Sequence, residues 1–464
     1  MDEKRLHLLS KAPVGKAIVT MAIPVVMGMM IQVLYNVVDI YFIGKLQDPN
    51  QLAAANITTP LFMIMMAISG IIGTGAASYI SRCMGKKDYD KASRVLSSGM
   101  AICLCLGLLT AAFGCLFITP IVNALGANEA TFSFALNYSL VLLLGAGIIM
   151  CNFALSQLLR SEGAVVVSMM GMLIGTVANV ILDPVFIFAL KMGIKGAAIA
   201  TVLGNAFGLV YYIVFYMRGK SLVEFKLHNI IPQKEILKEI FKVGVPSSVS
   251  QFLMGVAVML CNNLALAYGN NTVAGMGVAS KIMTIGTFIF MGFAAGCQPL
   301  IGYNFGAKSY GRVKEIIKKG MLITSLIGIV LTVLFGLFAK ELMAFFTPLP
   351  EVIAQGSIIL RGLMWSLPVF GAQMVGAVTV QAMGKGGASL LLSFARQGIF
   401  YMPILYLLNG VFGLSGLILA QPIADALALI LVIVVLGVII KNSQKAAKQT
   451  GISDEQDNAS ATVL

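Results

Sequence analysis

The chain has few charged residues and almost no histidine. Of its 464 residues, 11% are charged and 58% are hydrophobic, and the mean hydropathy is +0.92. Since about a quarter of the residues of a soluble domain are charged, this composition excludes a soluble globule and indicates a polytopic membrane protein. The two histidines, His7 and His228, both fall in polar segments. Their positions argue against a histidine-ligated metal centre or a buried histidine base.

Motifs for metal, cofactor or nucleotide chemistry are also missing. The seven cysteines show neither metal-ligand spacing nor a disulfide framework, and most lie in apolar runs, where they serve as small packing residues. The segment Gly302–Ser309 contains two glycines and a lysine, but its spacing is not that of a Walker loop. We therefore expect no enzymatic activity, no metal and no cofactor. The energy for any transport must then come from an ion gradient or a partner protein.

The sequence contains instead a series of long apolar runs. Most are about 20 residues or longer, enough for a helix to cross a hydrocarbon core of about 30 Å. Strand-like alternation is absent, and an open sheet would leave backbone polar groups unsatisfied in lipid. The sequence therefore predicts an all-α polytopic membrane protein with twelve transmembrane helices, at about 17–43, 53–81, 95–118, 132–159, 164–190, 196–217, 243–268, 273–303, 320–338, 352–381, 387–408 and 414–440.

The two halves of the chain are weak copies of each other. Met84–Tyr89 returns as Phe305–Tyr310, and Pro24 returns as Pro246, at offsets of 221 and 222. Six spans per copy mean that both copies enter the membrane from the same side, so the repeats are parallel and related by a pseudo-two-fold axis along the membrane normal. Such duplicated bundles are typical of secondary transporters, because rocking one copy against the other exposes a central site to each side in turn.

This organisation predicts four segments. They are an N-terminal lobe with spans 1–6 at 1–217, a cytoplasmic linker at 218–242, a C-terminal lobe with spans 7–12 at 243–440, and a disordered cytoplasmic tail at 441–464.

Basic residues predict the orientation in the membrane. The N-terminus, the even-numbered loops and the tail hold 25 of the 32 Lys and Arg residues. The positive-inside rule then predicts that both termini lie in the cytoplasm. We expect the chain to be a multi-pass protein of the cell's inner membrane. Because the bases are spread along loops, they suit lipid headgroups, and we expect no nucleic-acid partner. We expect the protein to be a monomer in the lipid bilayer.

Three acidic residues lie well inside predicted spans: Asp39, Asp183 and Asp425. Intramembrane carboxylates are costly, so each is a candidate functional residue. The alternative is a structural ion pair with one of the buried bases, such as Arg396. For Asp425 both roles stay open: it could attract a cationic substrate, or it could pair with Arg396.

Depth groups two of these acids with two neutral residues. Asp39 lies six residues before the lysine of the first outer loop and Asp183 eight before the first lysine of the third, so both are about 9–12 Å below the outer helix ends. Thr201 lies at about the same depth in span 6, and Asn179 is one turn from Asp183 on the same helical face. We therefore predict a cation-coupling site formed by Asp39, Asn179, Asp183 and Thr201.

The predicted site suits either of two ions. Two neighbouring carboxylates in a poorly solvated pocket cannot both ionise cheaply, so at least one should hold a proton near neutral pH. The same oxygens could instead enclose Na⁺. Pro24 interrupts span 1, the helix that carries Asp39, and we interpret it as a hinge that responds to protonation, with a static kink as the alternative.

Four motifs resemble those of the MATE (multidrug and toxic compound extrusion) transporters. They are Tyr35–Gly44, Arg160–Gly163, Asn179–Pro184 and Gln381–Gly386, and the chain is most similar to the MepA-like bacterial branch. The resemblance implies two six-helix lobes, alternating access, and export of amphiphilic organic cations in exchange for H⁺ or Na⁺. It also implies an ion site in the first lobe, carried over onto the four residues grouped above by depth.

The resemblance leaves some positions open. A polar residue of the family's fourth helix corresponds to Asn152 or Gln157. The NorM-like branch has an acid-bearing site on helices 7 and 10, where this chain shows Gln251 and Gln373 but no carboxylate, so ion coupling through those helices is in doubt. For substrate contacts, helices 1 and 7 and the deep second-lobe acid suggest Gln32, Tyr35, Asn36, Gln251, Met254 and Asp425.

Other functions compete with a multidrug antiporter. The same fold could serve an exporter dedicated to one natural product or metabolite. A flippase for lipid-linked sugars fits less well, because such chains commonly have fourteen spans. A channel or a non-transporting scaffold is the alternative from a different class. The 27 methionines suit a deformable pocket that accepts varied shapes, although Met is also common filler in a lipid core.

Overall fold

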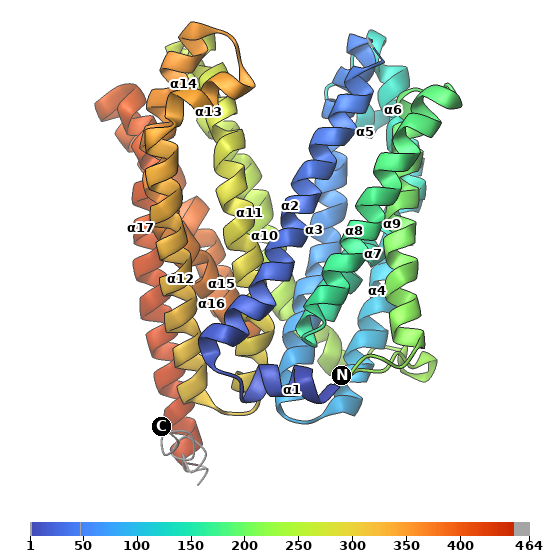
Figure 1. Cartoon of the computed structure of the whole chain (residues 1–464), viewed down its shortest axis with the longest axis vertical. Helices are drawn as coiled ribbons and strands as arrows, with labels where there is room; N and C mark the ends of the chain where they lie inside the picture. The colour runs from blue at the N-terminus through green and yellow to red at the C-terminus, as the bar shows by residue number, and fades with distance from the viewer. Residues whose placement is uncertain (1, 47, 450–464) are drawn as a thin grey trace. The chain divides into compact units, whose positions relative to one another are not determined.

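Almost every described residue lies in a helix. The structure, a computed structural model, describes residues 2–46 and 48–449 (Figure 1). Ten helical stretches are long and apolar enough to cross a membrane, and a bent pair of helices makes an eleventh crossing. The last stretch has 60 residues and is interrupted at Gly413, where φ is 58° and ψ is −136°, so it counts as two crossings. The predicted all-α fold with twelve transmembrane helices is confirmed.

The first repeat forms the helices of the N-terminal half, and several begin where their sequence supplies a cap. The side chain of Asp48 accepts a hydrogen bond from Asn50 N–H ahead of Pro49, and the side chain of Asp88 accepts one from Lys91 N–H. The elements are α1 (Asp2–Ser10), α2 (Val14–Gly44), α3 (Pro49–Gly85), α4 (Tyr89–Leu116), α5 (Ile118–Ala124), α6 (Glu129–Leu144), α7 (Ala146–Ser161), α8 (Val165–Pro184), the π-helix η1 (Val185–Ala189) and α9 (Ile194–Met217).

The second repeat follows a linker that contains the short 3₁₀-helix η2 (Leu227–Asn229). Its last helix continues to Gln449, so the first nine residues of the expected disordered tail are helical, and residues 450–464 lie outside the described part of the chain. The elements are α10 (Lys234–Ala265), η3 (Leu266–Tyr268), α11 (Asn270–Gly306), α12 (Tyr310–Leu337), α13 (Ala339–Phe346), α14 (Pro350–Leu363), η4 (Met364–Ser366), α15 (Leu367–Ala382), α16 (Gly386–Phe394), the π-helix η5 (Ala395–Tyr401) and α17 (Met402–Gln449).

Backbone conformations recur at the repeat offset. Positive φ angles occur at Lys87 and Lys308, at Gly163 and Gly384, and at Gly193 and Gly413. Each pair is separated by 220 or 221 residues. The left-handed region is unfavourable for a residue with a Cβ atom, so its recurrence at matched positions shows that the two halves share their turns as well as their helices.

The chain divides into two compact units, and the division splits the first helix of each repeat. The first unit contains residues 1–7 and 27–245, and the second contains 8–26 and 246–464. The chain therefore passes between units inside α2, two residues after Pro24, and inside α10, directly before Pro246. We call residues 8–26 the α2 arm and residues 234–245 the α10 arm. The sequence predicted a division at the linker, which would have left both helices whole.

Glycine residues allow each arm to pack closely against a helix of the unit to which it belongs. A Cβ atom added to Gly244 of the α10 arm would overlap the carbonyl oxygen of Ile71 in α3, and one added to Gly75 would overlap that of Ile240. In the second unit, a Cβ atom on Gly296 of α11 would come within 2.6 Å of the Cα atom of Ala22. Backbones approach this closely only where glycine removes the side chain.

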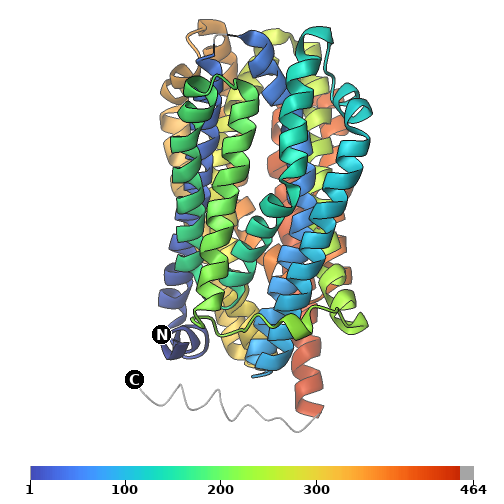
Figure 2. The same ribbon diagram turned by 90° about the vertical axis from the view of Figure 1, so that its right-hand side faces the viewer.

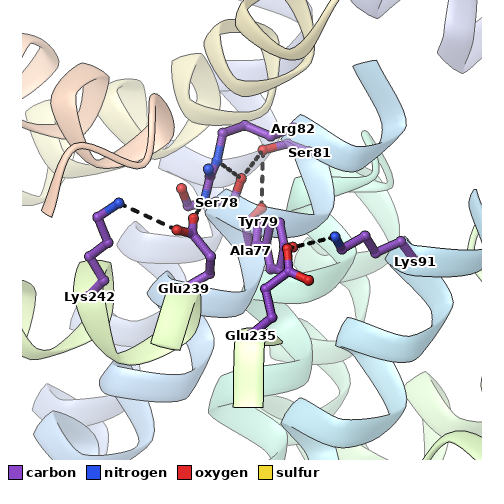
Figure 3. A network of polar contacts seen from close by, with 9 residues as sticks. All are labelled: Ala77, Ser78, Tyr79, Ser81, Arg82, Lys91, Glu235, Glu239 and Lys242. Atoms are coloured by element: carbon purple, nitrogen blue, oxygen red, sulfur yellow. Dashed lines mark hydrogen bonds and ion pairs between the residues drawn. The ribbon is translucent and has the colours of Figure 1, made fainter. Parts of the chain in front are cut away.

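Ion pairs fasten the α10 arm to the first unit. Arg82 contacts Glu239 at 3.0 Å, and Lys91 contacts Glu235 at 2.8 Å (Figure 3). Both bases also lie over the ring of Tyr79, at 5.1 and 5.7 Å from its centroid. Such half-exposed pairs add little stability one by one, but together they fix the rotation of the arm on α3.

The linker is held by hydrogen bonds from its backbone N–H groups and one of its hydroxyls to buried side chains of the first unit. The carboxylate of Glu162 accepts hydrogen bonds from Leu222 N–H, at 3.1 Å, and from the hydroxyl of Ser221. Farther along, the N–H group of Lys226 donates to the Ser97 hydroxyl at 3.0 Å. Figure 2 shows the linker passing across the end of α4 on its way from α9 to α10.

Replacing Gly244 with alanine should destabilise the seat of the α10 arm. The new Cβ atom would overlap the Ile71 carbonyl, and overpacking of this kind costs about 1–3 kcal/mol. We expect a lower apparent melting temperature for purified Gly244→Ala protein in detergent. Gly255→Ala on the same helix is the matched control, because a Cβ atom there meets nothing within 4 Å. Equal melting temperatures for the two variants would contradict the close packing.

Glu162 should make stability depend on pH. Burial raises the pKa of Glu162 to about 7 from an ordinary value of 4.5, so between these values the folded protein holds a proton that the unfolded chain releases. The free energy of unfolding should then fall as pH rises from about 4.5 to about 7, by up to about 3 kcal/mol, and level off above. To test this prediction, melting temperatures of wild type and Glu162→Gln are measured across this pH range and their slopes are compared. Glu341→Gln, which changes an exposed acid, is the control. An unchanged slope in Glu162→Gln would count against this assignment.

Candidate functional site

The fifth span carries its acid at the point where regular helix ends. Pro184 follows Asp183 and has no N–H group to bond the carbonyl of Val180, and the next five residues wind as the π-helix η1. Asp183 is fully buried, and Asn179, one turn earlier, is 2% exposed. Single π-turns inside helices are frequent at functional sites, because they re-aim the side chains beside them.

The fourth span is broken beside the sixth. Helices α6 and α7 meet at Gly145 with a bend of 56°. A Cβ atom on Gly145 would overlap the side chain of Val202, so the break packs against α9 next to Thr201. Broken spans are typical of transporter sites, since irregular backbone at membrane depth is tolerated where it lines a functional cavity.

Tyr35 links the first span to the sixth. Its hydroxyl and that of Thr201 share a hydrogen bond of 3.0 Å. Tyr35 lies one turn before Asp39 on α2 and interacts electrostatically with both Asp39 and Asp183. On the fifth span, Asn179 packs against Gly204 of α9, one turn after Thr201, where a Cβ atom would lie 2.9 Å from the Asn179 side chain.

The carboxylates of this cluster have no partners of their own. One oxygen of Asp39, both oxygens of Asp183 and both polar atoms of Asn179 are buried without a hydrogen bond. The charge of Asp39 acts on Asp183, and within residues 2–46 and 48–449 neither acid forms an ion pair with a base. Buried polar groups are normally satisfied, and an unpaired buried charge is very costly. The cluster is therefore suited to take up a proton or a small cation.

The structure brings together the four residues that depth alone had grouped. Asp39, Asn179, Asp183 and Thr201 all belong to the first unit, and their two acids lie close enough to interact. We call these four residues together with Tyr35 the first-unit acid site. Their role in coupling stays a prediction. Tyr35 had been predicted as a substrate contact, and its hydrogen bond places it within this site.

Sequence reasoning missed Tyr138. This buried residue of α6 interacts electrostatically with both Asp39 and Asp183. In the sequence it stands between Asn137 and Ser139, and no pattern shows which of these side chains faces the two acids.

The structure also separates two candidates on the fourth span. Asn152 donates to the side-chain oxygen of Asn205 at 2.9 Å, and Asn205 donates to the carbonyl of Thr201 at 2.8 Å. Gln157 instead accepts from Thr74. Asn152 is therefore the residue connected to the first-unit acid site.

The remaining predicted substrate contacts are spread over the chain. Gln32 is half-buried on α2, and Gln251 and Met254 are exposed on α10. The side chain of Asn36 lies outside the described part of the structure. Their role as substrate contacts stays a prediction.

Asp425 has a different environment from the acids of the first unit. It is 1% exposed in the second unit, and its Oδ1 atom accepts a hydrogen bond from Arg396 Nε at 2.9 Å. Its Oδ2 atom accepts one from Gln421 Nε2 at 3.0 Å. Of the two roles left open by the sequence, the ion pair with Arg396 is formed, and binding of a cationic substrate stays a prediction.

Comparison with known proteins gives consistent results. A family model described as MatE matches twice, at residues 24–185 and 246–407, which confirms the internal repeat. The chain is 33% identical over 427 residues to the multidrug export protein MepA of Staphylococcus aureus (strain MSSA476), covering 92% of this chain and 94% of that one. It is 32% identical to the protein of the same name from Staphylococcus saprophyticus, over 94% of this chain and 97% of that one. A solved structure described as the outward-facing conformation of a multidrug resistance MATE family transporter of the MOP superfamily superposes with a TM-score of 0.90 at 29% identity, over 95% and 98% of the two chains.

Proposed function

The chain belongs to the MATE family of multidrug efflux transporters, and on that premise we propose that it is a secondary active antiporter that exports amphiphilic, often cationic compounds in exchange for H⁺ or Na⁺. The observation that carries this proposal is the pair of carboxylates Asp39 and Asp183. Each has an oxygen buried without a hydrogen bond, and neither pairs with a base among the residues that the structure describes. A structural ion pair would have its cation within the protein. Here the cation must come from solution, and it can leave again.

The exchange follows from the cost of these charges. When the two acids are ionised and close together they repel each other, and the empty site is unfavourable in a poorly solvated environment. Uptake of a proton or Na⁺ relieves the repulsion and satisfies oxygens of Asp39, Asp183 and Asn179. The site therefore has two states of different preferred geometry, and the ion gradient selects between them.

The bound ion acts on the transport cycle through helix α2. This helix carries Tyr35 and Asp39 in the first unit and, beyond Pro24, the α2 arm in the second. Proline deprives the carbonyl of Thr20 of its helical partner, so a bend there costs less than elsewhere in the helix. A change of loading at Asp39 alters the bend at Pro24 and reopens the substrate path to the other side.

The topology and substrates are part of the same proposal. Both termini lie in the cytoplasm, the chain crosses the cell's inner membrane as a monomer, and the substrates are small amphiphiles that reach it from the cytoplasm or the lipid. The relatives named as multidrug export proteins support this reading of the substrates, and the distribution of basic residues supports the orientation.

Removing either acid should uncouple transport. Asp39→Asn and Asp183→Asn keep the size of the side chain but cannot take up a proton or hold a cation by charge. We expect each to abolish gradient-driven ethidium efflux from membrane vesicles while the amount of inserted protein stays at the wild-type level. Glu341→Gln, which changes an exposed acid on α13, is the control and should transport normally. Wild-type ethidium efflux in either aspartate variant would refute the role of the first-unit acid site.

Separate ion gradients should identify the coupling ion. Purified protein in proteoliposomes is given a proton gradient without Na⁺, or a Na⁺ gradient at equal pH, and accumulation of ethidium against its own gradient is followed by fluorescence. We expect at least one gradient to drive accumulation, and Asp39→Asn to remove the response to it. A channel cannot concentrate the dye, and a scaffold moves none, so absence of accumulation under both gradients would contradict the proposed antiport.

A further inference from the structure

The second unit contains an arginine inside a membrane-spanning helix. Arg396 lies in the π-helix η5, about ten residues into its span, and keeps only 13% of its side-chain area exposed. A charged group at this depth is costly and normally faces the protein interior. At about 1.5 Å per residue it lies about 15 Å from the start of α16, too deep for a lipid headgroup to reach.

The guanidinium group is held in a fixed orientation. Its Nε atom donates to Asp425 Oδ1 at 2.9 Å, and its central carbon lies 4.4 Å from the ring centroid of Phe370. That ring packs edge-to-face on Phe290 with centroids 5.9 Å apart. Asp425 is held in turn by Gln421. Each contact constrains the plane of the guanidinium group.

The two terminal nitrogens of Arg396 are left without partners. Among the described residues neither Nη1 nor Nη2 makes a hydrogen bond, and neither is a fully buried unsatisfied atom, so both reach an accessible surface. A purely structural pair would gain most by using this fork on both oxygens of Asp425. Here Asp425 accepts a hydrogen bond from Nε only. Nη1 and Nη2, the two donors that could bind both oxygens of a carboxylate, have no partner among the described residues.

Two buried amides belong to the same two elements as Arg396 and Phe370. Gln397 follows Arg396 in η5, and Gln373 lies one turn after Phe370 in α15. Both are 3% exposed, and the Oε1 atom of each is buried without a hydrogen bond. These two oxygens are unsatisfied polar atoms of the interior, whereas Nη1 and Nη2 of Arg396 are the donors that stay accessible.

The first unit has no equivalent of this arrangement. At the repeat offset, Arg396 corresponds to Gly175, whose position is closed by the carbonyl of Gly204, where a Cβ atom would come within 2.9 Å. At the same offset, Gln373 corresponds to Asn152, and Asp425 corresponds to Asn205. These two asparagines are neutral and hydrogen-bonded to each other. The guanidinium group is therefore a feature of the second unit alone.

We propose that Arg396 is an anion-recognition residue, oriented by Asp425 and Phe370, that binds the carboxylate of an amphiphilic substrate through Nη1 and Nη2. This inference rests on the proposed export function and names the residue that would hold the carboxylate of a substrate that carries one. Asp425 is a positioning residue in this arrangement. Its negative charge offsets that of Arg396 while no substrate is bound.

Two dyes that differ by one methyl ester test the site. Rhodamine 110 has a free carboxylate, and rhodamine 123 is its methyl ester. Binding of each to the full chain in lipid nanodiscs is measured by fluorescence anisotropy without an ion gradient. Arg396→Gln should weaken rhodamine 110 binding about 10-fold or more, since hydrogen bonds to charged groups are the strong ones, and change rhodamine 123 binding less than about 2-fold.

A second variant separates recognition from folding. Asp425→Asn keeps an oxygen for Arg396 Nε but removes the negative charge, so it should bind rhodamine 110 at least as tightly as wild type. Melting temperatures establish that both variants fold. The inference would be overturned if Arg396→Gln weakened the binding of both dyes equally or of neither dye. It would also be overturned if wild type did not bind rhodamine 110, or if Asp425→Asn bound rhodamine 123 more weakly than wild type. Glu341→Gln, which changes an exposed acid outside the site, is the control and should bind both dyes as wild type does. Binding is measured without an ion gradient, so a failure of coupled transport would not by itself change this result.

Discussion

The first unit depends on two carboxylates, Asp39 and Asp183, that have no base among the described residues. The charge of Asp39 acts on Asp183, and one oxygen of Asp39 and both oxygens of Asp183 are buried without a hydrogen bond. Such an arrangement is unfavourable unless the protein gains something from it, because ionised groups removed from water cost several kcal/mol each. The backbone around them is irregular: a π-helix follows Asp183, and the fourth span breaks next to Thr201. Irregular backbone and unsatisfied charge are found together at functional sites, and the proposed uptake and release of an ion would use both.

The two repeats share a backbone and differ in how they treat charge. Matched left-handed residues show that the turns are common to both. In the first unit Asp39 and Asp183 have no partner base among the described residues. In the second, Asp425 is already matched by Arg396 within the protein. A duplicated fold can thus divide two tasks, with ion loading in one copy and substrate chemistry in the other, because rigid helices allow the side chains to diverge while the packing is kept.

Much of this could be predicted from the sequence, for physical reasons. The rise of an α-helix is constant, so counting residues from loop lysines placed Asp39, Asp183 and Thr201 at one depth, and the structure brings them together. The length of apolar runs predicted twelve crossings for the same reason. Tyr138 was missed because it stands between Asn137 and Ser139, and the sequence does not show which of the three faces the acids. Asn205 was missed because a single polar residue in an apolar run has no periodicity to mark it. The orientation of Arg396 also could not be predicted, since the free side of a guanidinium group depends on tertiary contacts.

The division of α2 and α10 between the units was the least predictable feature, and it has a mechanical consequence. Glycine contacts and ion pairs that no local pattern encodes seat the α10 arm on α3. A helix held at its two ends by different bodies must deform if those bodies move. The deformation is easiest where a backbone hydrogen bond is already missing, and Pro24 and Pro246 lie within two residues of the two crossing points. Under the proposed mechanism, ion loading at Asp39 and the bend at Pro24 belong to the same helix, so a local change of charge reaches the second unit through α2 itself.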